Sequence, residues 1–407
     1  MKVLDYKRIL IIGFVWPEST SSAAGRRMMQ LISFFKEREY ELVFASTASE
    51  SEFSDELDGI VKISIQLNSS TFDSMITEMQ PSIVLFDRFM TEEQFGWRIA
   101  QFCPNAIRIL DSEDLHCLRE ARKQTILKNK TFDLNSDLAK REIASIYRCD
   151  LTLIISEYEV ALLETYFKIP SFLLLYLPIR AEKSVLDESE FEKRNDFIFI
   201  GNFLHAPNHD AVLYLKEHIW PLIFAQLPDS KMHIYGAYPT NAIKACHHPK
   251  SNFFVHGRTE KIENIFLTAR LLLAPLRFGA GIKGKLLESM QFGTPNVTTS
   301  TGAEGMFGTM AWNGAIADSP KDFAEKAIML YDNKITWQEA QQNGYSILNS
   351  RFTKDKFDMI LENGLDDKCA HIEKYRSENF IGLMLTHHTM QSTKYMAKWI
   401  EAKNQNS

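Results

Sequence analysis

The chain has 407 residues, of which 45% are apolar and 24% are charged, a composition typical of a globular protein large enough for two domains. Its 46 basic and 52 acidic side chains give a formal net charge of -6, so no overall field attracts nucleic acid or an anionic lipid surface. These values exclude a disordered chain and a small disulfide scaffold. Five widely spaced cysteines without a C-x-x-C pair favour a reducing compartment.

The N-terminus carries Lys2, Lys7 and Arg8 before an apolar run over residues 9–16. This pattern fits a short signal peptide or a first β-strand, and the run is near the minimum length for a signal peptide, which favours the strand. No apolar run approaches the roughly 18 residues of a membrane span. We therefore expect a cytoplasmic protein, at most peripheral at the inner face of the membrane.

The first half of the chain alternates short apolar runs with helical patterns. A helix is predicted over residues 25–38, where apolar residues recur at helical spacing. Strands that are apolar throughout and separated by helices indicate a parallel sheet covered on both faces. The predicted strands are residues 9–15, 42–45, 60–65, 83–86, 107–110 and 151–155.

The same alternation begins again after a polar, charged stretch at residues 181–196. Two doubly wound, Rossmann-like α/β domains are therefore predicted over residues 1–185 and 186–366, facing a cleft. Helices over residues 367–407 are predicted to pack back on the first domain. The later strands are residues 197–200, 232–235, 253–255, 271–275, 296–298 and 315–317, with helices at 210–225, 260–268 and 284–292.

The segment 274–305 carries the strongest chemical signal. A loop with Gly279 and Gly281 follows a strand and precedes a helix that begins with Lys283 and Lys285. Small residues allow close approach to a ligand, and a helix N-terminus favours phosphate. The glycines alone fit a tight turn equally well, but the lysines favour a diphosphate site. Glu288 fits either a surface ion pair with Lys285 or a contact to ribose hydroxyls.

A second polar cluster ends the strand at residues 107–110. Asp111, Asp114 and His116 fit either reactive groups at the edge of the cleft or acids that cap the next helix. Asp87 and Arg88 end the neighbouring strand, and a buried structural ion pair is the favoured interpretation for them.

The segment 274–305 resembles the donor-nucleotide loop of GT-B glycosyltransferases of the family 4 type, the glycosyl transferases group 1. The resemblance extends over residues 151–169, FIFIGNFL at 197–204, 232–236 and FFVHGRT at 253–259. Before residue 151 it rests on architecture and on the turn around Gly25. It implies an acceptor domain, then a nucleotide-sugar donor domain, then crossover helices.

The resemblance assigns roles to individual residues. Glu288 is similar to the family's ribose-binding glutamate, the second of a pair eight positions apart, and Ala280 stands where the first would be. Asn202 replaces an arginine after Gly201, which leaves Arg277, Lys283 and Lys285 as the phosphate cations. Asp114, then His116, is placed near the transferred sugar, and Gly25 and Arg26 on the acceptor side. The donor-binding set is Gly201, Asn202, Gly257, Arg258, Arg277, Gly279, Ala280, Gly281, Ile282, Lys283, Lys285 and Glu288.

The implied activity is transfer of a hexosyl group from a nucleotide diphosphate sugar, UDP- or GDP-linked, to a hydroxyl of a glycan or lipid-linked acceptor. Retention of configuration and a role in surface polysaccharide or glycoconjugate synthesis follow from the resemblance. We expect no cofactor, no metal and no nucleic acid, since adjacent histidines at 247–248 and 387–388 diverge on a helix. A nucleotide-sugar epimerase and a catalytically silent GT-B module are the alternatives.

Basic residues near the first helix leave two further interpretations open. Arg26, Arg27, Lys36 and Arg38 fit a peripheral membrane contact or, preferably, a solvated helix face. The last helix carries Tyr395, Met396, Trp399 and Ile400 at spacings of three and four.

Overall fold

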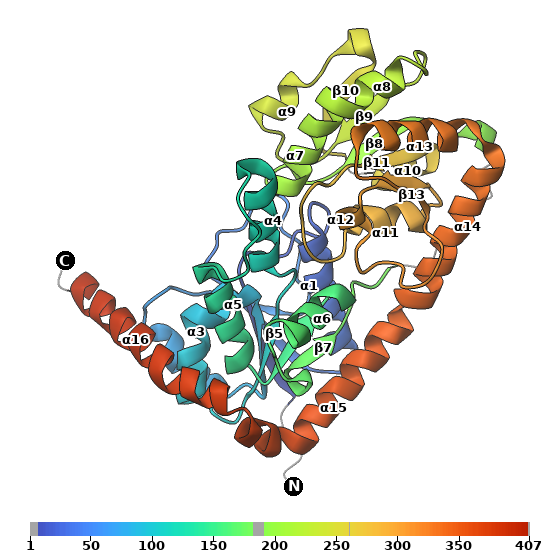
Figure 1. The fold of residues 1–407 in the computed structure, drawn as a ribbon. Helices are drawn as coiled ribbons and strands as arrows, with labels where there is room; N and C mark the ends of the chain where they lie inside the picture. Colours follow the sequence, from blue (N-terminus) through green and yellow to red (C-terminus); the bar gives the residue numbers. More distant parts are fainter. Residues whose placement is uncertain (1–6, 182–190, 260, 406–407) are drawn as a thin grey trace.

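A computed structural model describes residues 7–181, 191–259 and 261–405 of the protein. Two parallel sheets lie one after the other along the chain, each flanked by helices, and two long helices return from the second sheet to the first (Figure 1). This confirms the predicted pair of doubly wound domains. Most of the linker predicted at 181–196 lies outside the described residues. No described helix is long and apolar enough to cross a membrane.

The first sheet has the strand order β3-β2-β1-β4-β5-β6-β7, with all neighbours parallel. Six strands lie within two residues of their predicted ends, whereas β7 was not predicted, although it lies within an apolar run at residues 172–177. The strands are β1 (Arg8–Gly13), β2 (Glu41–Ser46), β3 (Val61–Ser64), β4 (Ile83–Asp87), β5 (Ile107–Asp111), β6 (Leu151–Ile154) and β7 (Leu174–Tyr176).

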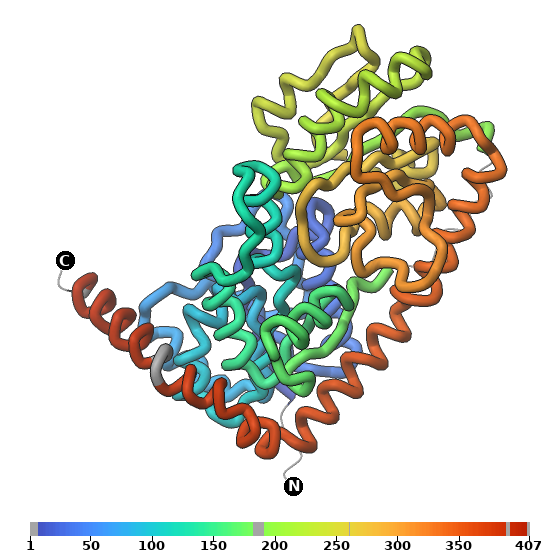
Figure 2. The backbone as a smooth tube through the Cα atoms, in the orientation of Figure 1, coloured from blue at the N-terminus to red at the C-terminus, as the bar shows by residue number. Residues whose placement is uncertain are grey.

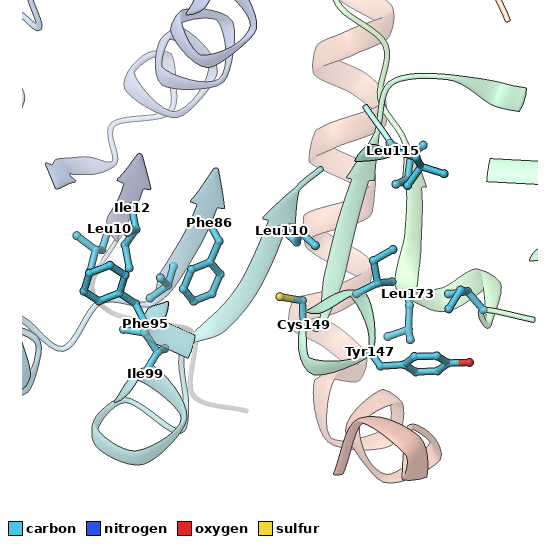
Figure 3. Close-up of a cluster of buried hydrophobic side chains, with 14 of the residues drawn as sticks. Leu10, Ile12, Phe86, Phe95, Ile99, Leu110, Leu115, Tyr147, Cys149 and Leu173 are labelled. Atoms are coloured by element: carbon cyan, nitrogen blue, oxygen red, sulfur yellow. The ribbon is translucent and has the colours of Figure 1, made fainter. Parts of the chain in front are cut away.

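Helices cover both faces of this sheet, and the buried side chains of one face are drawn in Figure 3. The first helix begins where the Ser22 side chain accepts a hydrogen bond from the Gly25 amide. A Cβ at Gly25 would lie 2.4 Å from the Glu18 backbone, so this close turn requires glycine. The helices are α1 (Ala23–Glu37), α2 (Thr71–Met79), α3 (Arg88–Phe102), α4 (His116–Lys128), α5 (Asp137–Arg148), α6 (Glu157–Thr165) and the short η1 (Ser171–Leu173).

The second sheet has the order β10-β9-β8-β11-β12-β13, again all parallel. The predicted helix at 210–225 is one run with a π-helical turn in its middle. The strands are β8 (Asn195–Ile200), β9 (Met232–Tyr235), β10 (Phe253–Gly257), β11 (Ala269–Ala274), β12 (Asn296–Thr298) and β13 (Gly314–Ile316). The helical segments are η2 (Phe191–Lys193), α7 (Ala206–Tyr214), η3 (Leu215–Ile219), α8 (Trp220–Phe224), α9 (Asn241–Ala245), η4 (Pro249–Ser251), α10 (Ile262–Thr268), α11 (Gly284–Gln291), α12 (Ser300–Ala303) and α13 (Pro320–Asp332).

Three helices complete the chain. From α14 (Lys334–Arg351), which packs on α11, the chain passes to α15 (Lys354–Glu378) and α16 (Phe380–Gln405), which run along the first domain (Figure 2). Phe357, Leu361 and Leu365 of α15 are buried on the first sheet, although they precede residue 367, where the predicted crossover begins. The predicted return of the tail to the first domain is confirmed.

The inner face of α16 is not the apolar stripe seen in the sequence. Ala397 packs on Trp97, and a Cβ at Gly382 would lie 2.2 Å from the Tyr147 carbonyl oxygen, so small residues make the contact. Tyr395 and Trp399 are instead 61% exposed. The stripe therefore faces solvent, because small residues let the helix approach α3 and α5 closely on its other side.

Strand order reverses between β1 and β4 in the first sheet and between β8 and β11 in the second. The loops that follow such neighbouring strands diverge, and ligands of doubly wound proteins bind at these points. The loops after β5 and β11 meet each other between the domains, where the Gly281 amide bonds a first-domain side chain.

Candidate active site

The loop after β11 is buried against the first domain. Gly281 has φ +65°, and a Cβ there would lie 2.7 Å from Ile155 Cδ1 and 2.9 Å from Asp114 Cβ. The predicted donor loop, including Gly279, Ala280 and Ile282, therefore lies directly against the residue predicted to act near the sugar. Glycine at 281 is required both by the backbone conformation and by this close approach.

Two buried lysines follow the loop. Lys283 and Lys285 are each 8% exposed, with Lys283 Nζ 2.6 Å from the Gly281 carbonyl oxygen and Lys285 Nζ 2.5 Å from Asn208 Oδ1. Within the described chain, neither amine lies within ion-pair distance of a carboxylate. Burial lowers the pKa of Lys283 to about 8 and that of Lys285 to about 7, and Lys283 lowers the latter further. Buried amines of this kind are suited to an anionic ligand.

The turn after β8 lies beside these amines. A Cβ at Gly201 would lie 2.7 Å from the Asn208 side chain and 3.0 Å from Lys285 Nζ, so the predicted donor residues Gly201 and Lys285 are neighbours. Asn202 reaches the Ser21 carbonyl oxygen of the first domain at 3.5 Å. His205, which the sequence analysis did not assign, lies in the same group. Its pKa is lowered to about 4 by desolvation and by Arg119 and the two lysines, against the opposing effect of Asp114.

Glu288 does not form the surface ion pair with Lys285 that the sequence left open. Its carboxylate is buried and pairs with Arg26 of α1, while Lys285 bonds Asn208. A Cβ at Gly284 would lie 3.0 Å from Ala23 Cβ, so the N-terminal turns of α1 and α11 touch. The predicted acceptor-side residue Arg26 thus holds the predicted ribose-binding carboxylate.

Asp114 and His116 lie at the first-domain edge of this region. Against the opposing effect of burial, the charges of Arg119, His116 and His205 hold the pKa of Asp114 well below its usual range. His116 Nδ1 lies 3.8 Å from Asp114 Oδ1 and 3.3 Å from Glu142 Oε1.

The capping interpretation of these acids is wrong. Helix α4 is preceded by Leu115, and its first amides, of His116 and Cys117, donate to the carboxylate of Glu142. Asp114 instead pairs with Arg119, and Asp111 with Arg27. The buried pair Asp87 and Arg88 is present, with Arg88 Nε 3.7 Å from Asp87 Oδ1.

Glu159 of α6 joins the two domains, and sequence reasoning missed it. Its Oε1 accepts hydrogen bonds from the Leu115 amide at 3.0 Å and the Gly281 amide at 2.8 Å. Burial, reinforced by the charge of Asp114, raises the pKa of Glu159 to about 8. The loop amide expected to face a phosphate therefore faces a carboxylate of the first domain. The sequence Ser156-Glu157-Tyr158-Glu159 is typical of a capping box, which hid this role.

Arg122 of α4 is a second missed bridge between the domains. It donates to the Gly279 carbonyl oxygen at 2.9 Å and forms two hydrogen bonds, of 2.8 and 2.7 Å, with the carboxylate of Glu304. Nothing local in the sequence links Arg122 to Glu304, which lies 182 positions further along the chain.

The other predicted donor residues have separate positions. Arg258 donates to Thr20 Oγ1 of the first domain at 3.2 Å, and Gly257 before it has φ +82°. Arg277 pairs with Asp210 of α7 at 2.5 Å, so its charge is already neutralised. Lys283 and Lys285 remain as the cations of the loop.

The preferred interpretation of the basic residues at α1 as a solvated helix face holds for the exposed Lys36 but not for the arginines. Arg27 is buried against Asp111, Arg26 pairs with Glu288, and Arg38 pairs with Glu362. The membrane contact considered for these residues is therefore not supported. In the described part of the chain, no three histidine, cysteine or acidic side chains are grouped so that they could hold a metal ion.

Two facing Rossmann-like domains with a crossover of C-terminal helices define the GT-B class. Residues 194–333 match the family described as glycosyl transferases group 1. This part of the chain thus fits a group 1 glycosyltransferase, within a chain that has the GT-B fold.

Two solved structures share the fold of this chain, and one curated protein is similar to it in sequence. Sucrose-phosphate synthase from Thermosynechococcus elongatus superposes with a TM-score of 0.70 at 12% identity, over 89% of this chain and 99% of that one. Anabaena HepE in complex with UDP and glucose has a TM-score of 0.63 at 13% identity, over 89% and 100%. An uncharacterised 44.6 kDa protein in the cps region of Klebsiella pneumoniae is 24% identical over 233 residues, 53% of this chain and 56% of its own length. The chain thus spans little more than half of that curated relative.

Proposed function

We propose that this protein transfers a sugar from a nucleoside diphosphate sugar to a hydroxyl group of an acceptor. The observation that carries the proposal is the pair of buried amines, Lys283 and Lys285, at the N-terminus of α11, which have no carboxylate partner among the residues that the structure describes. The N-terminus of a helix adds favourable potential for an anion at this point. HepE, which has the same fold, was crystallised with UDP and glucose.

The reaction places negative charge on the departing diphosphate. Protonated Lys283 and Lys285, fixed by the loop and by Asn208, would stabilise that charge without a metal ion or another cofactor. Asp114 would lie next to the transferred sugar because its Cβ abuts the donor loop at Gly281. Retention of configuration, a hexosyl group and a glycan or lipid-linked acceptor complete the proposal, on the strength of the family resemblance.

Donor binding requires the interface to rearrange. The Gly281 amide is engaged by Glu159, and the Glu288 carboxylate by Arg26, so both donor-loop groups are occupied by the first domain. We infer that the domains separate to admit the nucleotide and close again for transfer. On this view Glu288 exchanges Arg26 for the ribose hydroxyls.

A catalytically silent GT-B module is the second candidate. Ala280 occupies the position of the first glutamate of the family pair, and Arg26 holds the second. Such a module would bind a nucleotide or a glycan without turnover.

Thermal unfolding with UDP, GDP, ADP, TDP and CMP tests both candidates, on the wild type and on Glu288→Ala. We expect one nucleotide to raise the Tm of the wild type and to lose most of that shift in the variant, because a ligand stabilises the fold by mass action. Turnover of the matching nucleotide sugar then separates the candidates: acceptor-dependent release of the nucleotide supports transfer, and tight binding without turnover supports the silent module. An epimeric sugar formed without acceptor would indicate an epimerase, and no shift with any nucleotide would contradict the transferase.

A further inference from the structure

The outward face of α16 carries an apolar stripe on the outside of the first domain. Tyr395 and Trp399 each lie two positions from the buried Ala397, which places them roughly 160° around the helix from it. Seven large apolar side chains of this helix are exposed: Phe380, Ile381, Leu383, Met384, Tyr395, Met396 and Trp399. An exposed group of this size marks an interaction surface.

The charges on α16 are divided between its two faces. Lys398 and Lys403 lie roughly 100° and 120° to either side of the direction of Ala397, so they flank the stripe. The only carboxylate in the sequence of the helix, Glu401, faces inward and accepts a hydrogen bond from the Ser70 amide at 2.8 Å. The outward face therefore combines aromatic rings with positive charge, in a chain whose net charge is -6.

This combination is typical of a helix that lies in the surface of an anionic bilayer. Tryptophan and tyrosine are enriched at the level of lipid headgroups, and each nearby lysine adds attraction to anionic lipids. Pairing with a second copy of this chain would bring lysines against lysines with no outward carboxylate to offset them. A membrane contact at α1 was the less favoured interpretation of its basic residues, and the arginines there are engaged within the protein.

We propose that the outward face of α16 docks the protein on an anionic lipid surface, with Tyr395 and Trp399 inserted at headgroup depth and Lys398 and Lys403 facing anionic headgroups. The helix lies on the outside of the first domain (Figure 1), and its apolar stripe is exposed, so it can rest flat on a membrane without unfolding. This docking is independent of the proposed sugar transfer.

Sedimentation of the full chain with vesicles tests the proposal. We expect binding to vesicles that contain phosphatidylglycerol, no binding to pure phosphatidylcholine vesicles, and weaker binding in high salt. Two variants should each reduce binding by about tenfold or more, Lys398→Glu with Lys403→Glu, and Tyr395→Ser with Trp399→Ser. Matched controls on the second domain should bind like the wild type: Lys244→Glu with Lys250→Glu, and Met329→Ser with Ile335→Ser.

A second measurement does not depend on the folding of the double variants. Brominated lipids should quench a component of the tryptophan fluorescence that is absent from Trp399→Phe. Failure of the wild type to bind anionic vesicles, equal binding by the tail variants, or equal binding to neutral vesicles would overturn the proposal. So would a wild-type dimer that dissociates in Trp399→Ser without any vesicle binding, because the stripe would then be a protein interface.

Discussion

The two sides of the domain interface bury titratable groups of opposite charge, and the hydrogen-bond partners of these groups differ. On the first-domain side, Glu159 has a pKa raised to about 8 but receives two backbone hydrogen bonds, one from each domain. On the second-domain side, Lys283 and Lys285 have lowered pKa values, and their hydrogen bonds among the described residues go to neutral oxygens, while Lys285 Nζ also lies 4.1 Å from the centroid of the Phe199 ring. The acid of the first domain is thus held partly by the second domain, whereas no described carboxylate lies within ion-pair distance of the two lysines. On the proposed function, the negative charge of the donor would lie against these lysines, and the first domain would close the site.

The most severe way to break this arrangement is Gly281→Ala. The added methyl would meet Ile155 and Asp114 across the interface at 2.7 and 2.9 Å, so we expect the domains to be held apart. Small-angle X-ray scattering should show a larger radius of gyration, and kcat/KM for transfer should fall by about a hundredfold. Gly59→Ala is the control, since Gly59 has a similar φ of +74° but its Cβ would meet only Lys36 Nζ at 3.7 Å. An unchanged scattering profile would contradict the role of this contact.

Replacing Lys285 should weaken ligand binding but increase the stability of the ligand-free protein. We expect Lys285→Met to weaken binding of the preferred nucleotide by about tenfold or more, because a charge-assisted hydrogen bond is lost. The same change should raise the free energy of unfolding of the ligand-free protein by about 1 kcal/mol, because it removes a buried amine without an anion. Titration calorimetry and thermal unfolding measure the two effects. Lys326→Met, which removes a half-exposed ion pair with Asp322, should change neither in this way.

Nucleotide binding should be accompanied by proton uptake at the two lysines. Near pH 7.5, amines with pKa values of about 8 and 7 are together short of roughly one proton, and a bound diphosphate raises both values. Calorimetry in two buffers of different ionisation enthalpy should therefore show uptake of up to about one proton on nucleotide binding. The uptake should shrink in Lys285→Met, and its persistence there would assign the protons to other groups.

The smallest expected effect is on the pH dependence of the free energy of unfolding, to which the lysines and Glu159 contribute with opposite sign. The lysines bind fewer protons folded than unfolded between about pH 7 and their ordinary value of 10.5, so their contribution to stability rises with pH there. Glu159 binds more protons folded than unfolded between its ordinary value of 4.5 and about 8, so its contribution falls over that range. Urea unfolding at several pH values should show the first slope reduced in Lys285→Met and the second in Glu159→Gln. Identical slopes in a variant and the wild type would show that another group titrates.

The sequence predicted the parts of this protein that are encoded locally. Alternating apolar runs gave both sheets, and only the three-residue strand β7 was missed. The glycine loop and its lysines were found because they are consecutive. Contacts that depend on domain closure had no local signal: Arg26 and Glu288 are 262 positions apart, and Glu159 fits a capping box by its spacing alone. The spacing of aromatic residues likewise did not identify the inner face of α16, because small residues rather than aromatic ones make the contact there.

Helix α15 also has a consequence for how the chain is made. Phe357 and Leu361 complete the face of the first sheet on which α1 packs, and Arg376 bonds Asp150 with two hydrogen bonds of 2.8 Å. During synthesis, the apolar face of the first domain emerges from the ribosome long before these residues exist. The core of the first domain therefore cannot be completed until α15 has been synthesised, which is after the whole second domain.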